Sequence, residues 1–256
     1  MISLGAYCQQ NTIDGHIHLF DKDGCIIVPD MKCVGFCDIE PKHIDQYQNT
    51  IPYYEGFIKN DYKDNIMLLA ASADPSNMIE IHKKWPDIIK GFGEVKCYKE
   101  WKGVKLNLDV LGKYNELCRY AQEHNLPIFM HYSLYDDFNV SRLSNFIRKY
   151  PELKIVLCHC GMDKETDNDF CYHSVIKLMN EHHNLWIDVT WEALDYFSNN
   201  PFKLINMNRD RMILGSDMSR LSMNEKNYKN EWDKIHNLDV LIKSDKNIKK
   251  LFVWKT

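Results

Sequence analysis

Short apolar runs recur along the whole chain, separated by longer polar or amphipathic segments. The runs cover residues 13–20, 31–37, 65–73, 88–98, 127–132, 154–161, 185–190 and 211–217. The run 65–73 is almost continuously apolar and ends at Asp74-Pro75, a pattern typical of a strand that is buried on both faces. The pattern therefore predicts eight short β-strands.

Most segments between these runs have helical periodicity. Helices are predicted over 76–85, 109–124, 140–150, 170–183 and 228–242, with Ser76 capping the first and Pro86 ending it. The segment 41–59 has helical character that Pro52 interrupts. Alternating strands and helices predict a parallel sheet with right-handed crossovers. Eight repeats in 256 residues favour a closed TIM (β/α)₈ barrel, a single α/β domain over 1–256. An open doubly wound sheet is the alternative, but it needs a glycine-rich phosphate loop that the first strand lacks.

Composition and charge favour a soluble protein over a membrane protein or a nucleic-acid-binding protein. Hydrophobic residues make up 45% and charged residues 27%, which is ordinary for a soluble globular protein. The net charge of -4 gives no sign of a nucleic-acid partner. No secretory signal or membrane-length apolar run is visible, so we expect a cytoplasmic protein that acts on a small molecule, with homo-oligomerisation left open. The nine cysteines are scattered, and we expect free buried thiols rather than disulfides.

Candidate chemistry collects where the predicted strands end. His16 and His18 lie two apart in the first run, so a strand would present both rings on one face. Neutral imidazole is a common ligand of zinc and related metals. In a parallel barrel all carboxyl ends meet at one mouth. The other polar residues at these ends are Glu94, Lys96, His131, His159, Asp188 and Asp217. Each alone could be structural, and Asp14 and Asp188 are expected to orient neighbouring histidines.

Several residues near these ends have competing interpretations. Cys158 and Cys160 flank His159, and strand alternation predicts His159 inward with both thiols facing the helices. Cys33 and Cys37 have no second pair at zinc-finger spacing. Five further side chains are candidates to line the mouth: Trp101, Tyr132, Tyr135, Trp191 and Arg220.

The ordered set of strand-end residues resembles the amidohydrolase superfamily of metal-dependent barrels. Asp14-Gly-His16-Ile-His18, His131, His159 and Asp217 in Gly-Ser-Asp match it in order, over essentially the whole chain. The match is most similar to the amidohydrolase-related branch (family 2), with a relation to TatD-type hydrolases through Gly93-Glu94. The chain is short for the decarboxylase-type members, which argues for a small open site and against decarboxylation.

The resemblance implies a set of site residues. Its metal ligands are His16, His18, His131 and Asp217, with His159 either a second-metal ligand or a catalytic residue. Glu94 is the preferred strand-four ligand, and a carboxylated Lys96 is the alternative. The cofactor is one or two divalent ions, zinc first and manganese, iron or nickel next. Lys96 and Arg220 are candidates to contact an anionic substrate.

These residues predict a metal-dependent hydrolase. A metal-activated water would attack a small amide, ester, lactone or phosphoester, with Asp217 moving the proton. A TatD-like deoxyribonuclease is a second hypothesis, although no basic groove is visible. A catalytically inactive barrel that binds metal or a partner is a third.

Overall fold

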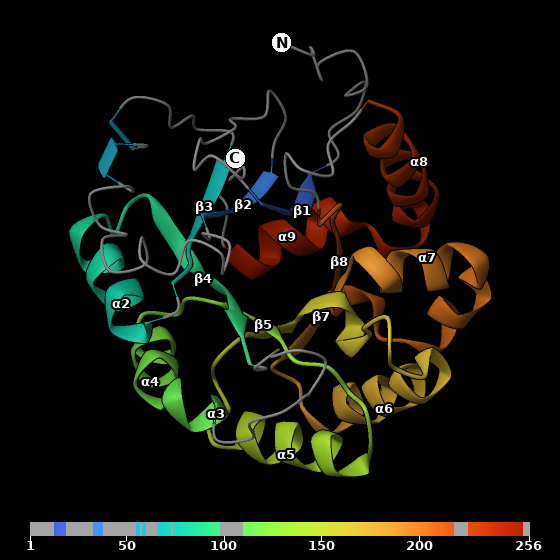
Figure 1. Ribbon diagram of the computed structural model, residues 1–256, viewed down its shortest axis with the longest axis horizontal. Helices are drawn as coiled ribbons and strands as arrows, with labels where there is room; N and C mark the ends of the chain where they lie inside the picture. The colour runs from blue at the N-terminus through green and yellow to red at the C-terminus, as the bar shows by residue number, and fades with distance from the viewer. Residues whose placement is uncertain are drawn as a thin grey trace.

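The computed structural model describes residues 13–18, 33–37, 55–56, 58–59, 66–72, 74–97, 110–217 and 225–252. Its eight strands form one parallel sheet in the order β1 to β8, wrapped into a nearly closed TIM barrel with helices outside (Figure 1). The strands are β1 Asp14–His18, β2 Cys33–Cys37, β3 Ile66–Ala70, β4 Ile89–Lys96, β5 Ile128–His131, β6 Ile155–Leu157, β7 Leu185–Val189 and β8 Met212–Leu214. The fold class and all eight strands are confirmed.

The five predicted helices are present with revised bounds, and two further helices, over 191–199 and 244–252, were not predicted. The helices are α2 Pro75–Lys84, α3 Val110–Lys113, α4 Asn115–Glu123, α5 Asp137–Arg148, α6 Asn168–Glu181, α7 Trp191–Asn199, α8 Glu225–Ile242 and α9 Ser244–Phe252. Short 3₁₀ turns cover η3 Cys158–Gly161, η4 Pro201–Asn206 and η5 Arg209–Arg211. The predicted helix 109–124 is broken at Tyr114. Asp74, not Ser76, caps α2, because its carboxylate accepts the Ser76 backbone N–H at 3.0 Å. Most of the segment 41–59 lies outside the described residues.

Strand alternation sorts the apolar side chains into two layers. Alternate residues such as Met67 and Leu69 of β3 point into the barrel, while Ile66, Leu68 and Ala70 pack beneath the helices. Helix α9 crosses the middle of the ring (Figure 1) and places Ile248, Leu251 and Phe252 against the interior layer. The interior is thus a packed core that α9 covers at one end.

The barrel closes between β8 and β1 through the residues that follow β8. The Asp217 backbone N–H donates to the His16 carbonyl at 2.9 Å. The Ser216 N–H donates at 2.9 Å to Asp14, which also accepts the His16 N–H at 3.1 Å. A Cβ on Gly215 would lie 2.4 Å from the His16 nitrogen, so only glycine permits this approach.

Two expectations from composition can be compared with the described residues. Six cysteines of the described ranges are free and buried, as predicted: Cys33, Cys97, Cys118, Cys158, Cys160 and Cys171. Within the described ranges, no helix has both the length and the apolar character needed to cross a bilayer.

Candidate metal centre

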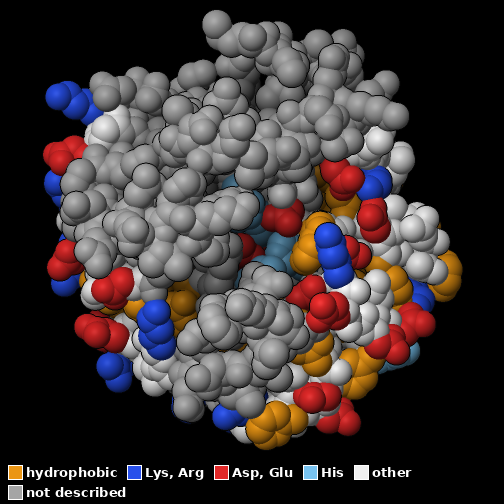
Figure 2. All heavy atoms as spheres, in the orientation of Figure 1, with side chains coloured by type: hydrophobic (Ala, Val, Ile, Leu, Met, Phe, Trp, Pro, Cys, Tyr) orange, Lys and Arg blue, Asp and Glu red, His pale blue; other side chains and the backbone are white. Residues whose placement is uncertain are grey.

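Two groups of metal-ligating side chains meet at the carboxyl ends of the strands. The first contains His16, His18 and Asp217, and the second contains Glu94, His131 and His159, with each group's donor atoms within 4.8 Å of one another. Figure 2 shows histidine and acidic side chains on the floor of an opening on this face of the molecule. All six predicted metal ligands therefore lie together, although His16 and Asp217 are 201 residues apart in the chain.

The first group is formed by β1 and the end of β8. His18 Nε2 lies 3.0 Å from Asp217 Oδ1, and His16 Nε2 lies 3.2 Å from the same oxygen. The two Nε2 atoms are 3.3 Å apart. Asp217 has a positive φ of 53°, which turns its side chain back over β1. Burial raises the pKa of Asp217, but His159, His16 and His18 outweigh it and hold the pKa well below its ordinary value.

The second group is centred on Glu94, which is almost completely buried. Glu94 Oε1 lies 2.6 Å from His131 Nδ1 and 3.1 Å from His159 Nε2. Burial raises the pKa of Glu94, but these two histidines more than offset it and keep the carboxyl ionised. Glu94 Oε2 is also 3.9 Å from His18 Nε2. Glu94 therefore lies between the two groups.

Glu94 reaches the interior through an irregular part of β4. The register with β5 shifts between Phe92 and Val95. A Cβ on Gly93 would lie 2.7 Å from both the Cβ and the carbonyl oxygen of Phe129, so the close contact with β5 requires glycine there. Lys96 ends β4, but its side chain and all of Arg220 lie outside the described residues. The carboxylated-lysine alternative and both substrate contacts stay predictions.

A second layer of polar groups fixes the orientation of two histidines. Asp188 of β7 accepts a hydrogen bond from His16 Nδ1, and both side chains are completely buried. Burial lowers the pKa of His16, but Asp188 raises it well above its usual value. Thr190 Oγ1 lies 2.7 Å from His159 Nδ1. Sequence reasoning anticipated Asp188 and missed Thr190, although Thr190 follows Asp188 by two residues and so shares its side of the strand.

His159 reaches the site in a way that strand alternation does not predict. Strand β6 ends at Leu157, and His159 and Cys160 have positive φ values of 55° and 57° in the turn that follows. Cys158 packs in the interior layer, whereas Cys160 packs beneath the helices. The prediction that both thiols face the helices is therefore wrong for Cys158, which continues the inward alternation of Val156, and the left-handed turn at His159 brings that residue to the site as well.

The inward thiol forms a third group with His16 and Asp188. Burial raises the pKa of Cys158 well above its ordinary value, so the sulfur keeps its proton at neutral pH. His16 Nδ1 and Asp188 are already hydrogen-bonded to each other, and Cys158 packs beside this pair.

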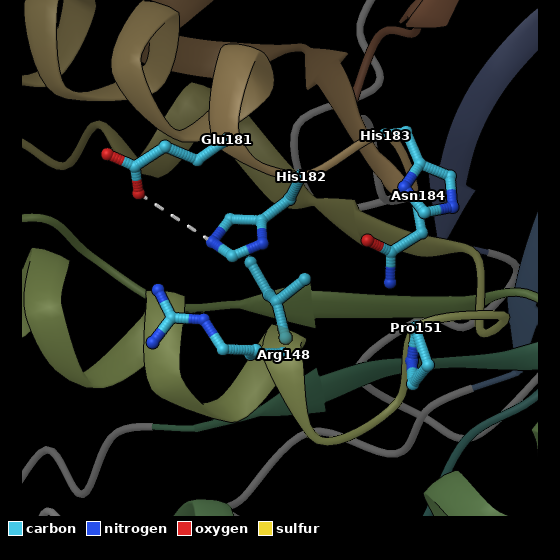
Figure 3. Close-up of a pocket in the computed structure, with 7 residues that line it drawn as sticks. Arg148, Pro151, Glu181, His182, His183 and Asn184 are labelled. Atoms are coloured by element: carbon cyan, nitrogen blue, oxygen red, sulfur yellow. Dashed lines mark ion pairs between the residues drawn. The ribbon is translucent and has the colours of Figure 1, made fainter.

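His182 occupies a structural position away from the metal centre. At the opposite ends of the strands, Arg148, Pro151, Glu181, His182, His183 and Asn184 line an open cavity of about 350 Å³ (Figure 3). There His182 Nε2 lies 2.8 Å from Ser144 Oγ and 3.9 Å from Glu181. Burial lowers the pKa of His182, which therefore stays neutral as a hydrogen-bond partner of α5.

Comparison with known proteins identifies the family of the chain. The sequence profile of the family described as Amidohydrolase matches residues 89–253, more than half of the chain. The chain belongs to the amidohydrolase family. No curated protein matches it. The relation to TatD-type nucleases finds no support in these matches.

Solved structures of amidohydrolases share the fold at low sequence identity. A probable 2-pyrone-4,6-dicarboxylic acid hydrolase from Acinetobacter baumannii, with citric acid bound, is 15% identical with a TM-score of 0.62, covering 96% of this chain and 100% of its own. An amidohydrolase from Burkholderia multivorans with bound zinc is 11% identical with a TM-score of 0.63, covering 95% and 99%. A 5-carboxyvanillate decarboxylase from Sphingomonas paucimobilis is 11% identical with a TM-score of 0.53, covering 89% and 80%. At such identities the likeness shows the fold alone.

Proposed function

We propose that this amidohydrolase is a metal-dependent hydrolase of a small amide, ester, lactone or phosphoester. The observation that carries the proposal is the pair of three-residue donor groups at the mouth of the barrel, with Glu94 between them. The match to the amidohydrolase family supports the proposal that the protein is an enzyme, and the donor groups support the proposal that it uses a divalent ion.

The residues present fit such an ion. Asp188 engages Nδ1 of His16, so Nε2 is the ring nitrogen that faces His18 Nε2 and Asp217 Oδ1, and it would give up its proton on binding a metal. The two ring nitrogens and the carboxylate oxygen lie about 3 Å apart, close enough for all three to bind one cation. Four imidazoles and two carboxylates form a donor set that suits zinc first, and manganese, iron or nickel next.

The six donors support a site for two ions. His16, His18 and Asp217 would hold one ion, His131 and His159 the other, and Glu94 would contribute to both. When bound, such ions supply Lewis acidity, which polarises a carbonyl or phosphoryl oxygen and acidifies water.

Asp217 is suited to move the proton of the reaction. Its side chain is 17% exposed, against 3% for Glu94, the other carboxylate of the two groups, so Asp217 borders the open side of the site. Its carboxylate is ionised at neutral pH, and its position at the open side would let it accept a proton from the attacking water and pass it to the leaving group. His159 lies behind it, with Nδ1 4.0 Å from Asp217 Oδ2, and a cationic or metal-bound ring there would stabilise negative charge developing on the substrate.

A substrate panel with and without chelator tests this proposal. The panel contains amides, esters, phosphoesters, lactones including 2-pyrone-4,6-dicarboxylic acid, 5-carboxyvanillate and DNA ends. We expect hydrolysis of at least one small substrate, its loss with chelator and its recovery with zinc. Asp217→Asn should lower kcat at least 100-fold while circular dichroism stays unchanged, and unchanged turnover would remove Asp217 as the base.

Other outcomes of the same panel would replace the proposal. Release of carbon dioxide from 5-carboxyvanillate without any hydrolysis would make the protein a decarboxylase. Cleavage of DNA ends alone would support the nuclease hypothesis, and bound metal with no turnover would support an inactive barrel.

A further inference from the structure

Trp191 forms one wall beside the metal centre. It directly follows Thr190, the residue that contacts His159 Nδ1, and it begins helix α7. Its ring lies edge-on to His159 with centroids 5.4 Å apart and is tilted against His131 at 6.5 Å. The aromatic surface therefore adjoins both histidines of the Glu94 group.

The backbone at Trp191 is held in a costly conformation. Its φ is 48°, a region that bulky L-residues rarely adopt. The Thr190 carbonyl accepts the N–H groups of Ala193 at 3.0 Å and Leu194 at 3.3 Å, so the first turn of α7 fixes this conformation. Strain of this kind in a folded protein concentrates where a side chain must point into a binding site.

Lys164 places a positive charge over this wall. Its Nζ lies 5.6 Å from the centre of the Trp191 ring, and it approaches no described carboxylate within ion-pair distance. The adjacent Asp163 is engaged by the hydroxyl groups of Tyr135 at 2.9 Å and Ser133 at 3.3 Å. These bonds fasten the loop after β6 to the loop after β5, so Lys164 is carried by an anchored segment at the rim. In Figure 2 a basic side chain stands beside hydrophobic ones at the edge of the opening.

We propose that Trp191 and Lys164 form a specificity subsite for substrates that carry a carboxylate on a planar ring. The flat ring would lie against Trp191, and Lys164 would leave the indole to pair with the carboxylate. The susceptible bond would then face His131 and His159. The position of the susceptible bond rests on the proposed function, whereas binding of the substrate at the subsite does not depend on it.

The expected effects are modest because Lys164 is exposed. An exposed ion pair changes affinity about 2- to 5-fold, and loss of an aromatic contact changes it about 2- to 10-fold. The alternative is that Lys164 only shields the indole from water and selects nothing.

Nuclear magnetic resonance on the metal-loaded protein, labelled with ¹⁵N at the tryptophan indoles, tests the proposal without needing turnover. Trp191→Phe assigns the Trp191 signal. Three probes of similar size are titrated: isophthalate, its neutral diamide, and saturated cyclohexane-1,3-dicarboxylate. We expect isophthalate to shift the Trp191 signal and to bind at least 2-fold tighter than either of the other two.

Two variants separate the contributions of charge and ring. Lys164→Gln should raise the Kd of isophthalate about 2- to 5-fold and abolish its advantage over the diamide. Trp191→Leu, followed through the other indole signals, should abolish its advantage over the saturated diacid. Lys177→Gln removes an exposed lysine of α6, away from the mouth, and should change neither.

Equal affinities of the three probes, or an unchanged isophthalate Kd in Lys164→Gln, would overturn the subsite. If Trp191→Leu does not fold, the Lys164 comparison decides alone. Hydrolysis of lactones without any preference for carboxylates would reject the subsite and keep the proposed function. A carboxylate preference without any turnover would keep the subsite and reject the proposed function.

Discussion

Replacing Asp188 by asparagine tests how the protein controls a metal-binding histidine. The Asp188 carboxylate and the His16 ring are completely buried and hydrogen-bonded to each other. An asparagine oxygen could still accept the Nδ1–H of His16, so the shape of the site is retained. What disappears is the negative charge that makes His16 a stronger ligand.

The magnitude follows from that loss of charge. Removing a carboxylate behind a metal-binding histidine weakens metal affinity about 10- to 100-fold, which corresponds to about 1.4–2.8 kcal/mol. His16 belongs to one of the two donor groups, so the loss should fall on that ion and leave the ion at Glu94 less affected.

Competition between the protein and a chromophoric chelator for zinc measures the effect. Asp195→Asn is the matched control, because Asp195 is an exposed residue of α7 that pairs with Lys234. We expect zinc affinity to fall in Asp188→Asn alone, with both variants folded. Equal affinity in Asp188→Asn and the unmodified protein would refute the role of Asp188 in holding His16 as a ligand.

Three further predictions concern single side chains. Thr190→Val removes the 2.7 Å contact to His159 Nδ1 and should lower kcat about 10-fold with a stability loss of about 1 kcal/mol, measured by turnover and urea unfolding. Burial lowers the pKa of His82 to about 4, below its ordinary 6.5, so the stability that the neutral ring contributes is complete above pH 6.5 and is lost as the pH falls toward 4. In His82→Gln the free energy of unfolding should therefore vary less with pH between 4 and 6.5. An unchanged slope in that range would contradict this prediction. Gly215→Ala places a methyl group 2.4 Å from the His16 nitrogen and should cost about 1–3 kcal/mol in the free energy of unfolding, a cost that zinc should partly offset if His16 is a ligand.

Strand positions could be predicted because burial on both faces gives nearly continuous apolar runs. The run 65–73 contains β3, and the alternation of Met67 and Leu69 with their neighbours places them in the barrel. Helix ends were less predictable, since Asp74 and Ser76 both suit a cap and only the backbone decides between them. Helix α9 was not predicted, because its contacts depend on the barrel opening that it covers.

The site could be predicted as far as parallel strands bring their ends together. His131 and Asp188 point inward from regular strands, as alternation requires. His159 lies in a left-handed turn after β6, so alternation counted from His159 assigned the Cys158 thiol to the wrong layer, whereas Cys158 follows Val156 inward. Lys164 carries no signal in the sequence, because its position over Trp191 depends on two loops held together by Asp163 and Tyr135.

Anomalous scattering at the zinc edge, from crystals grown with zinc, locates the bound metal directly. We expect a peak about 2.0–2.2 Å from the Nε2 atoms of His16 and His18 and from an Asp217 oxygen. A second peak is expected beside Glu94, His131 and His159. Zinc found only at other places on the molecule, with these six side chains ordered and empty, would contradict the account.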